Sequence, residues 1–244
     1  MKDFDEWIAE IDNELKPDKS FDIIKRPLKI GGRRAALYFI DGFIKDEVYE
    51  KILEFLYKQT PEEIAGIDDM SRFAENKLPY VETDAAYTAR EVVTAVLSGP
   101  SVLIIEGIRG ALLVDTRTYP MRGVEEPQKD RSLRGPRDGF VETLVMNTAM
   151  LRRRIRDSRL RMEYMQIGRE TKLDISIAYI DGKADKRVLE ILRQRLRAIQ
   201  AGGISMTQEA LAECLQKNAF FNPFPKFKFT ERPDYASACV LDGR

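Results

Sequence analysis

The chain contains no histidine, and this absence excludes several kinds of active site. Nucleophiles activated as in Ser-His-Asp or Cys-His sites need an imidazole, and so do the common zinc sites that use histidine. The two cysteines, Cys214 and Cys239, are too few for a sulfur-rich zinc site or a disulfide framework, which favours a reducing compartment. We therefore expect no metal and no other cofactor.

Net charge and long apolar runs are missing as well. The 40 basic and 40 acidic side chains cancel, so no overall field attracts the chain to nucleic acid or to anionic lipid. No apolar run approaches the roughly 20 residues that span a bilayer. The N-terminal sequence MKDFDEWIAEIDNELK is acidic and amphipathic, unlike a signal peptide. These features predict a soluble, cytosolic protein of one large or two small domains.

Apolar periodicity and turn residues predict an α/β fold. The expected strands cover residues 35–43, 101–107, 111–117, 160–168 and 172–182. The expected helices cover about 3–15, 46–58, 84–97, 185–199, 207–217 and 233–241, and a further helix begins at Pro136. We expect a loop with Pro17 and Pro27 after the first helix, and an irregular segment with room for a short helix at 59–80.

A weak internal repeat accompanies this pattern. ALYFIDGFIKDEVYEKILEFL (36–56) aligns with SIAYIDGKADKRVLEILRQRL (176–196), and each copy is a strand, an Asp-Gly turn and a helix. Such units also recur by chance in α/β proteins. The alternative is two α/β subdomains with small mixed sheets flanked by helices, at 35–157 and 158–244, after an N-terminal helix and arm at 1–34.

The stretch SLRGPRDGFVETLVMNTAMLRRRIR (132–156) is the most informative part of the chain. Pro136 suits a first helical turn, where acidic side chains complement the helix dipole, and the arginines of 152–156 suit its end. Asn147 is set into an otherwise apolar face. Arg134 and Arg137, which flank the turn, are not explained by helix formation.

Those two arginines have two interpretations. Free N–H groups at a helix start favour an anion, although Pro136 removes one donor and no phosphate-binding loop follows. Charge-dense loops more often end in ion pairs, with acidic residues of this loop or with a neighbouring subunit. We favour the ion pairs.

Asp41 and Asp181 each end a buried strand and are candidates for catalytic carboxylates, for ligands at a sheet edge or for interface residues. Turn chemistry is the better explanation, because Asp bonds its own backbone and the following Gly supplies a positive φ.

The stretch FFNPFPKFKFTERPD (220–234) interleaves phenylalanine with lysine. This pattern is compatible with RNA or a membrane interface, but an extended segment that covers a core is the commoner case in a neutral protein.

From about Gly31 to Arg244 the chain resembles the N-terminal region of GerA-family spore germinant receptor A subunits. The resemblance rests on SxRGPRDGFxETLxxNTAxLRRRI, on the preceding ALLVDTRTYPMRGVEEP, and on the later YIDG and NPFPKFKFTERPD. One departure is the region around and after Ile199, AIQAGGISMTQEA (198–210), where the family often has an acidic, aspartate-bearing version.

The resemblance implies a non-enzymatic domain on the cytoplasmic face of the spore inner membrane, acting in nutrient-triggered germination with B and C subunits. It also implies transmembrane helices after residue 244 and allows self-association of A subunits. We expect Arg134, Arg137, Glu142 and Asn147 to form a joint between subdomains or subunits. The alternative function is a small-molecule site, for a germinant or an anion, in the cleft between subdomains. Binding to nucleic acid is not expected.

Overall fold

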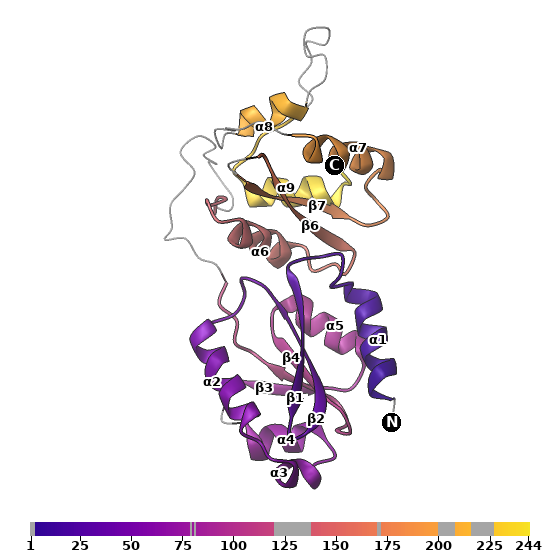
Figure 1. Ribbon diagram of the computed structural model, residues 1–244, viewed down its shortest axis with the longest axis vertical. Helices are drawn as coiled ribbons and strands as arrows, with labels where there is room; N and C mark the ends of the chain where they lie inside the picture. Colours follow the sequence, from indigo (N-terminus) through magenta and orange to yellow (C-terminus); the bar gives the residue numbers. More distant parts are fainter. Residues whose placement is uncertain are drawn as a thin grey trace.

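The computed structural model describes residues 3–78, 80, 82–119, 138–169, 172–199, 208–215 and 227–244. Figure 1 shows two lobes along the long axis, and we call residues 3–119 the first lobe and residues 138–244 the second. The first lobe contains α1 (Phe4–Leu15), β1 (Ile23–Ile30), β2 (Arg33–Ile40), α2 (Asp46–Tyr57), α3 (Pro61–Ala65), α4 (Met70–Lys77), β3 (Thr83–Ala86), α5 (Ala89–Ser98), β4 (Ser101–Ile105) and β5 (Ala111–Val114). The second contains α6 (Leu144–Arg154), β6 (Leu160–Ile167), β7 (Leu173–Ile180), α7 (Lys186–Arg197), α8 (Gln208–Leu215) and α9 (Pro233–Leu241). This confirms the predicted α/β class.

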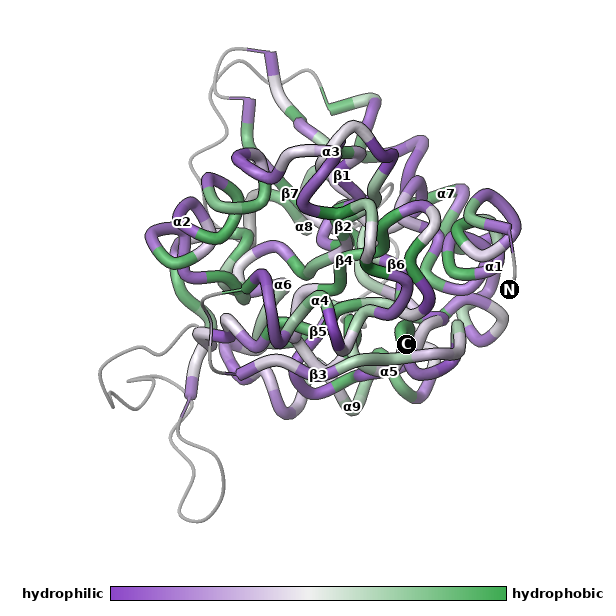
Figure 2. The backbone as a smooth tube through the Cα atoms, turned by 90° about the horizontal axis from the view of Figure 1, so that it is seen from below, coloured by the Kyte–Doolittle hydropathy of each residue, from purple (hydrophilic) through white to green (hydrophobic). Residues whose placement is uncertain are grey.

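The first lobe is built on a five-stranded sheet with the order β1-β2-β4-β5-β3. Side chains alternate between its faces, as the period of a strand requires. Tyr38 and Ile40 of β2 pack with α1 and α5 on one face, and Leu37 packs with α2, α3 and α4 on the other. All five residues of β4 are buried, as expected for a central strand covered on both faces. Figure 2 shows this apolar centre in green.

The second lobe places the two-stranded sheet β6-β7 between two helical layers. Leu160, Met162 and Ile180 face α6 and α9, while Ile177 faces α7 and α8. The strand pairs of both lobes are antiparallel, whereas the sequence suggested small mixed sheets. Short turns such as Gly31-Gly32 between β1 and β2 permit antiparallel pairing and are too short for a parallel crossover.

Three local predictions are wrong. Residues 23–30 form β1 instead of a loop, and Pro27 is tolerated because β1 is an edge strand. The helix expected at 84–97 begins at Ala89, since Thr88 and Glu91 form a capping box and the residues before it pair as β3. The helix expected from Pro136 begins at Leu144, so its first turn carries no acidic side chain.

The N-terminal segment also differs from the expected separate arm. α1 packs against α5, and β1 pairs with β2 along its whole length, so both belong to the first lobe. α6 contributes to two cores: Ala149 lies in that of the first lobe, and Leu151 and Ile155 lie in that of the second.

The internal repeat has a structural counterpart. α1-β1-β2-α2 and α6-β6-β7-α7 follow the same order of elements. The Asp41 N–H donates to the Asp22 carbonyl (2.8 Å), and the Asp181 N–H donates to the Arg159 carbonyl (2.9 Å), so each hairpin closes in the same way. The two units thus have the related build that the repeat suggested.

Candidate functional site

A fully buried arginine of α6 connects the two lobes. The side chains of Arg152 and Asp22 are both 0% exposed, and the Arg152 Nε donates to Asp22 Oδ2 at 2.6 Å. The Arg152 Nη2 donates to Asp22 Oδ1 (3.1 Å), Ser20 Oγ (3.2 Å) and the Leu160 carbonyl (3.2 Å). One guanidinium therefore binds a loop of the first lobe and a strand of the second.

The loop before β1 is fixed against β6 by further hydrogen bonds. The Ser20 hydroxyl donates to Asp22 Oδ1 (2.8 Å) and accepts from the Met162 N–H (3.1 Å). The Phe21 N–H donates to the Met162 carbonyl at 3.1 Å, and the Phe21 ring packs into the core of the second lobe. A buried ion pair with these additional partners is the arrangement that offsets the cost of desolvating two charges.

A second buried arginine forms the opposite side of this joint. Arg161 of β6 is 2% exposed, and its Nη1 donates to the carbonyls of Ser158 (2.6 Å) and Leu15 (3.4 Å), the latter at the end of α1. The Asp181 carboxylate lies 4.0 Å from both Arg161 Nε and Lys16 Nζ. Burial lowers the pKa of Arg161, and Asp181 opposes this shift. In each repeat unit, the end of the first helix therefore contacts the hairpin region of the other unit: α1 contacts β6, and α6 contacts the loop before β1.

Asp41 and Asp181 occupy equivalent turns but different electrostatic surroundings. Burial is the main cause that raises the pKa of Asp41, an N–H of Gly42 opposes it, and the Asp22 carboxylate adds to it. Asp181 instead faces the two cations described above. Turn chemistry explains both residues, because the next residues, Gly42 and Gly182, have φ of +81° and +86°.

This difference predicts opposite effects of the same substitution. Asp41→Asn is expected to raise the free energy of unfolding at neutral pH, because it removes a charge whose burial is unfavourable. The gain should be less than about 1 kcal/mol, since solvent screens the half-buried charge. The gain should vanish as the pH falls below the ordinary aspartate pKa, where the unfolded state also binds the proton. Asp181→Asn should destabilise, because Arg161 loses its counter-charge. Thermal unfolding of both variants at several pH values checks this, and equal signs would contradict it.

Of the four residues predicted to form a joint, the structure describes Asn147 and Glu142, and neither takes part in the Arg152–Asp22 ion pair. Asn147 accepts from the Val141 N–H (2.7 Å) and donates to the Val141 carbonyl (2.6 Å), so it holds the segment before α6. Glu142 is exposed within that segment. Arg134 and Arg137 lie outside the described residues. Asp138, expected near the dipole of the helix start, instead accepts a hydrogen bond from Arg154.

Arg152, Ser20 and Asp22, which form the main contact of the joint, were missed from the sequence. Arg152 was assigned to the helix dipole together with its neighbours. Arg152 follows Thr148 by four residues and precedes Ile155 by three, and both of these residues are buried. This spacing places Arg152 on the buried face of α6, whereas Arg153 is exposed. Ser20 and Asp22 carry no comparable signal, because polar residues before a strand are common in loops.

Among the described residues, no group of three or more histidine, cysteine, aspartate or glutamate side chains is placed to hold a metal ion. Within the same ranges, no helix has the length and apolar character that crossing a bilayer requires.

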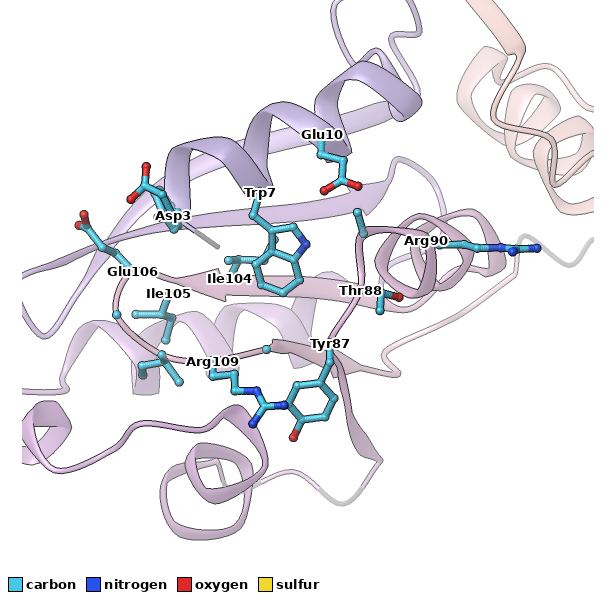
Figure 3. A pocket seen from close by; sticks show the side chains of 15 residues that line it. Asp3, Trp7, Glu10, Tyr87, Thr88, Arg90, Ile104, Ile105, Glu106 and Arg109 are labelled. Carbon is cyan, nitrogen blue, oxygen red and sulfur yellow. The ribbon is translucent and has the colours of Figure 1, made fainter. Parts of the chain in front are cut away.

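A pocket of about 720 Å³ lies on the first lobe, away from the joint. Its walls come from α1, from the turn between β3 and α5, and from the turn between β4 and β5. Figure 3 shows Trp7 of α1 on one side and Tyr87 and Arg109 on another. This pocket lies on the first lobe alone, so the alternative ligand site in the cleft between subdomains stays a prediction.

Comparisons with known proteins give a consistent result. The family model described as Bacillus/Clostridium GerA spore germination protein matches residues 9–244. Stage V sporulation protein AF of Bacillus subtilis (strain 168) is 36% identical over 95% of this chain and 46% of its own length. Spore germination protein KA of the same organism is 31% identical over 97% of this chain and 43% of its own length.

A solved structure matches as well. The crystal structure of the N-terminal domain of the A subunit of the Bacillus megaterium spore germinant receptor GerK3 has a TM-score of 0.68 and 28% identity, and the match covers 99% of this chain and 89% of that one. The chain spans less than half the length of the two curated relatives above.

Proposed function

Because the chain belongs to the GerA family of Bacillus and Clostridium spore germination proteins, we propose that it works as an assembly and signal-transduction module of a germinant receptor A subunit. The match to the N-terminal domain of another A subunit supports this role. We propose that the module lies on the cytoplasmic face of the spore inner membrane and works with B and C subunits, with self-association of A subunits as a further contact.

The joint between the lobes is the observation that carries this proposal. A module that passes on a displacement must move as a unit, and the buried Arg152–Asp22 pair couples α6 to the loop before β1. Arg152 and Asp22 are fully engaged in this coupling, so the proposal assigns them no catalytic reaction. Cancelling charges argue against a nucleic-acid partner.

Contact with another subunit is expected at the segment before α6. Glu142 is exposed there and forms no ion pair in the described part of the chain, and the same segment continues from Arg137. In the full-length protein, Arg137→Ala and Glu142→Ala should therefore reduce the amount of the other subunits that copurifies with it. Both variants should also slow nutrient-triggered germination. The thermal midpoint of the 244-residue chain should stay unchanged.

Arg187→Ala provides the matched control, because Arg187 is an exposed arginine of α7 with one neighbouring carboxylate, Asp185. It should leave assembly and germination unchanged. Normal assembly and germination of the Arg137 and Glu142 variants would refute the assigned interface. A lowered thermal midpoint would show that they act on folding.

A further inference from the structure

The outer edge of β7, on the side away from β6, is unpaired in the described part of the chain. The Asp181 N–H donates to the Arg159 carbonyl (2.9 Å), so every second residue of β7 from that point directs its backbone groups toward β6. The N–H and C=O groups of Asp174, Ser176 and Ala178 therefore point away from β6. Within the described residues these groups make no hydrogen bond with another backbone group, and no third strand joins the sheet.

The opposite edge of the same sheet is already used. Met162 of β6 lies opposite Ala178 in the register, and it also directs its backbone groups outward. Its N–H donates to the Ser20 hydroxyl, and its carbonyl accepts from the Phe21 N–H. Figure 1 shows β6 on the side of the first lobe and β7 on the side away from it. The joint therefore uses one edge of the sheet and leaves the outer edge of β7 available for another strand.

The internal repeat shows how such an edge is paired in the first lobe. Residue 36 aligns with residue 176, so β2 and β7 are equivalent strands. The outward groups of β2 pair with β4: the Glu106 N–H donates to the Arg34 carbonyl at 2.8 Å, and residues 35–38 lie opposite 102–105 in antiparallel register. The equivalent residues of β7 have no such strand beside them in the described second lobe. An antiparallel strand is therefore what this edge is built to accept.

The outer edge of β7 also lacks the features that protect an edge strand. Proline and lysine commonly prevent exposed edges from pairing with another chain. In β1, Pro27 stands where an N–H would point outward, and Lys25 and Lys29 lie on either side of it. Neither proline nor lysine occurs between Leu173 and Ile180. An antiparallel strand could therefore pair along the whole of this edge.

We propose that β7 pairs with β7 of a second copy, antiparallel and centred on Ser176, so that the two hairpins form one four-stranded sheet. In this register Asp174 lies opposite Ala178, and Ile175 lies opposite Ile177, so no like charges meet. The Ser176 Oγ is buried and has no hydrogen-bond partner among the described residues. The Ser176 hydroxyl of the second copy supplies one. Both copies use the same surface, as a twofold contact requires.

This contact gives the self-association of A subunits a defined surface, and its role in a receptor rests on the proposed function. It does not use the segment before α6, so the two contacts can fail independently. Pairing over so few residues is expected to be weak between free chains. It should strengthen where a receptor confines two copies to one membrane.

Disulfide cross-linking of the 244-residue chain tests the register, in a Cys214→Ser/Cys239→Ser background that removes both native thiols. Opposed residues of a hydrogen-bonded antiparallel pair have Cα atoms about 5.5 Å apart, which a disulfide can span. Ser176→Cys should therefore give a covalent dimer on mild oxidation. Asp174→Cys, at an exposed position of the same edge, is the matched control. It should give no dimer with itself, but it should cross-link when mixed with Ala178→Cys.

Sedimentation equilibrium measures the same pairing without a covalent bond. The unmodified chain should show a monomer–dimer equilibrium between micromolar and millimolar concentration. Ser176→Pro removes an outward N–H from each copy and should weaken dimerisation roughly tenfold or more. Its fold should persist, because Pro27 of β1 shows that an edge position of this kind tolerates proline. Circular dichroism verifies folding, and if Ser176→Pro unfolds, the cross-linking result decides.

Four results would each overturn the proposal. The first is a chain that stays monomeric at millimolar concentration. The second is a dimer of Asp174→Cys as abundant as that of Ser176→Cys. The third is an unchanged association constant in a folded Ser176→Pro variant. The fourth is cross-linking of Ser176→Cys, in the full-length receptor, to another subunit in place of a second copy.

Discussion

Arg152→Met is expected to destabilise the chain by about 3–5 kcal/mol, because it leaves the Asp22 carboxylate buried without its cation. The Asp22 side chain is 0% exposed and cannot reach water without opening the joint. Urea unfolding measures the effect with two probes. Trp7 fluorescence reports on the first lobe, and far-ultraviolet circular dichroism reports on both. The two transitions should coincide in the native sequence and separate in the variant, since the lobes lose their main polar connection.

Two further variants test the physical reason. Arg153→Met, at the exposed neighbouring position, removes only a contact with the Tyr119 ring (4.3 Å) and should cost about 1 kcal/mol or less. The double variant Asp22→Asn/Arg152→Met removes both charges and should regain a large part of the loss, because no buried charge remains. If Arg152→Met unfolded at the native midpoint, or if the double variant were no better than the single one, charge pairing would not be what holds the joint.

Gly42→Ala is expected to destabilise more than Gly182→Ala, although the two residues occupy the same position of the repeat. Both have a positive φ, +81° and +86°, so alanine costs about 1–2 kcal/mol of backbone strain at either position. At Gly42 the new Cβ would also lie 3.1 Å from Ala149 Cβ and Val145 Cγ1 of α6. At Gly182 it would meet nothing within 4 Å. Overpacking typically adds about 1–3 kcal/mol at the first position.

The difference between the two variants measures how tightly the turn of the first hairpin contacts α6. Thermal and urea unfolding give both free energies, and Gly182→Ala is the internal control for strain. Asn is the suitable second substitution at each position, because it tolerates a positive φ better than alanine does. Equal losses at Gly42 and Gly182 would mean that α6 moves aside at no cost.

Most elements of the fold could be predicted because their signals are local. Apolar periodicity located α1, α2, β4, β5 and α9 to within a few residues. β1 was missed because proline in a run of alternating residues argues against a strand, and only the sheet order reveals that the strand lies at an edge where no N–H is needed. The start of α6 was missed because Pro136 is a good first-turn residue but does not itself begin a helix.

The joint was less predictable, for a different reason. The partners in its main ion pair, Asp22 and Arg152, are 130 residues apart, and nothing in the spacing of either residue indicates the other. Asp41 and Asp181 were correctly interpreted as turn residues from local chemistry. The opposite electrostatic surroundings of these two aspartates depend on Asp22, Lys16 and Arg161, which only the folded chain brings near them.

The separation of Asp22 from Arg152 also bears on the order of events during translation. Every strand of the first sheet is complete once Val114 has been made, but Ala149 of its core and the cation for Asp22 are synthesised later. Until then the Asp22 carboxylate has no cation to pair with, so we expect the loop before β1 to stay open and hydrated. We therefore expect the first lobe to complete its folding only after α6 has been synthesised.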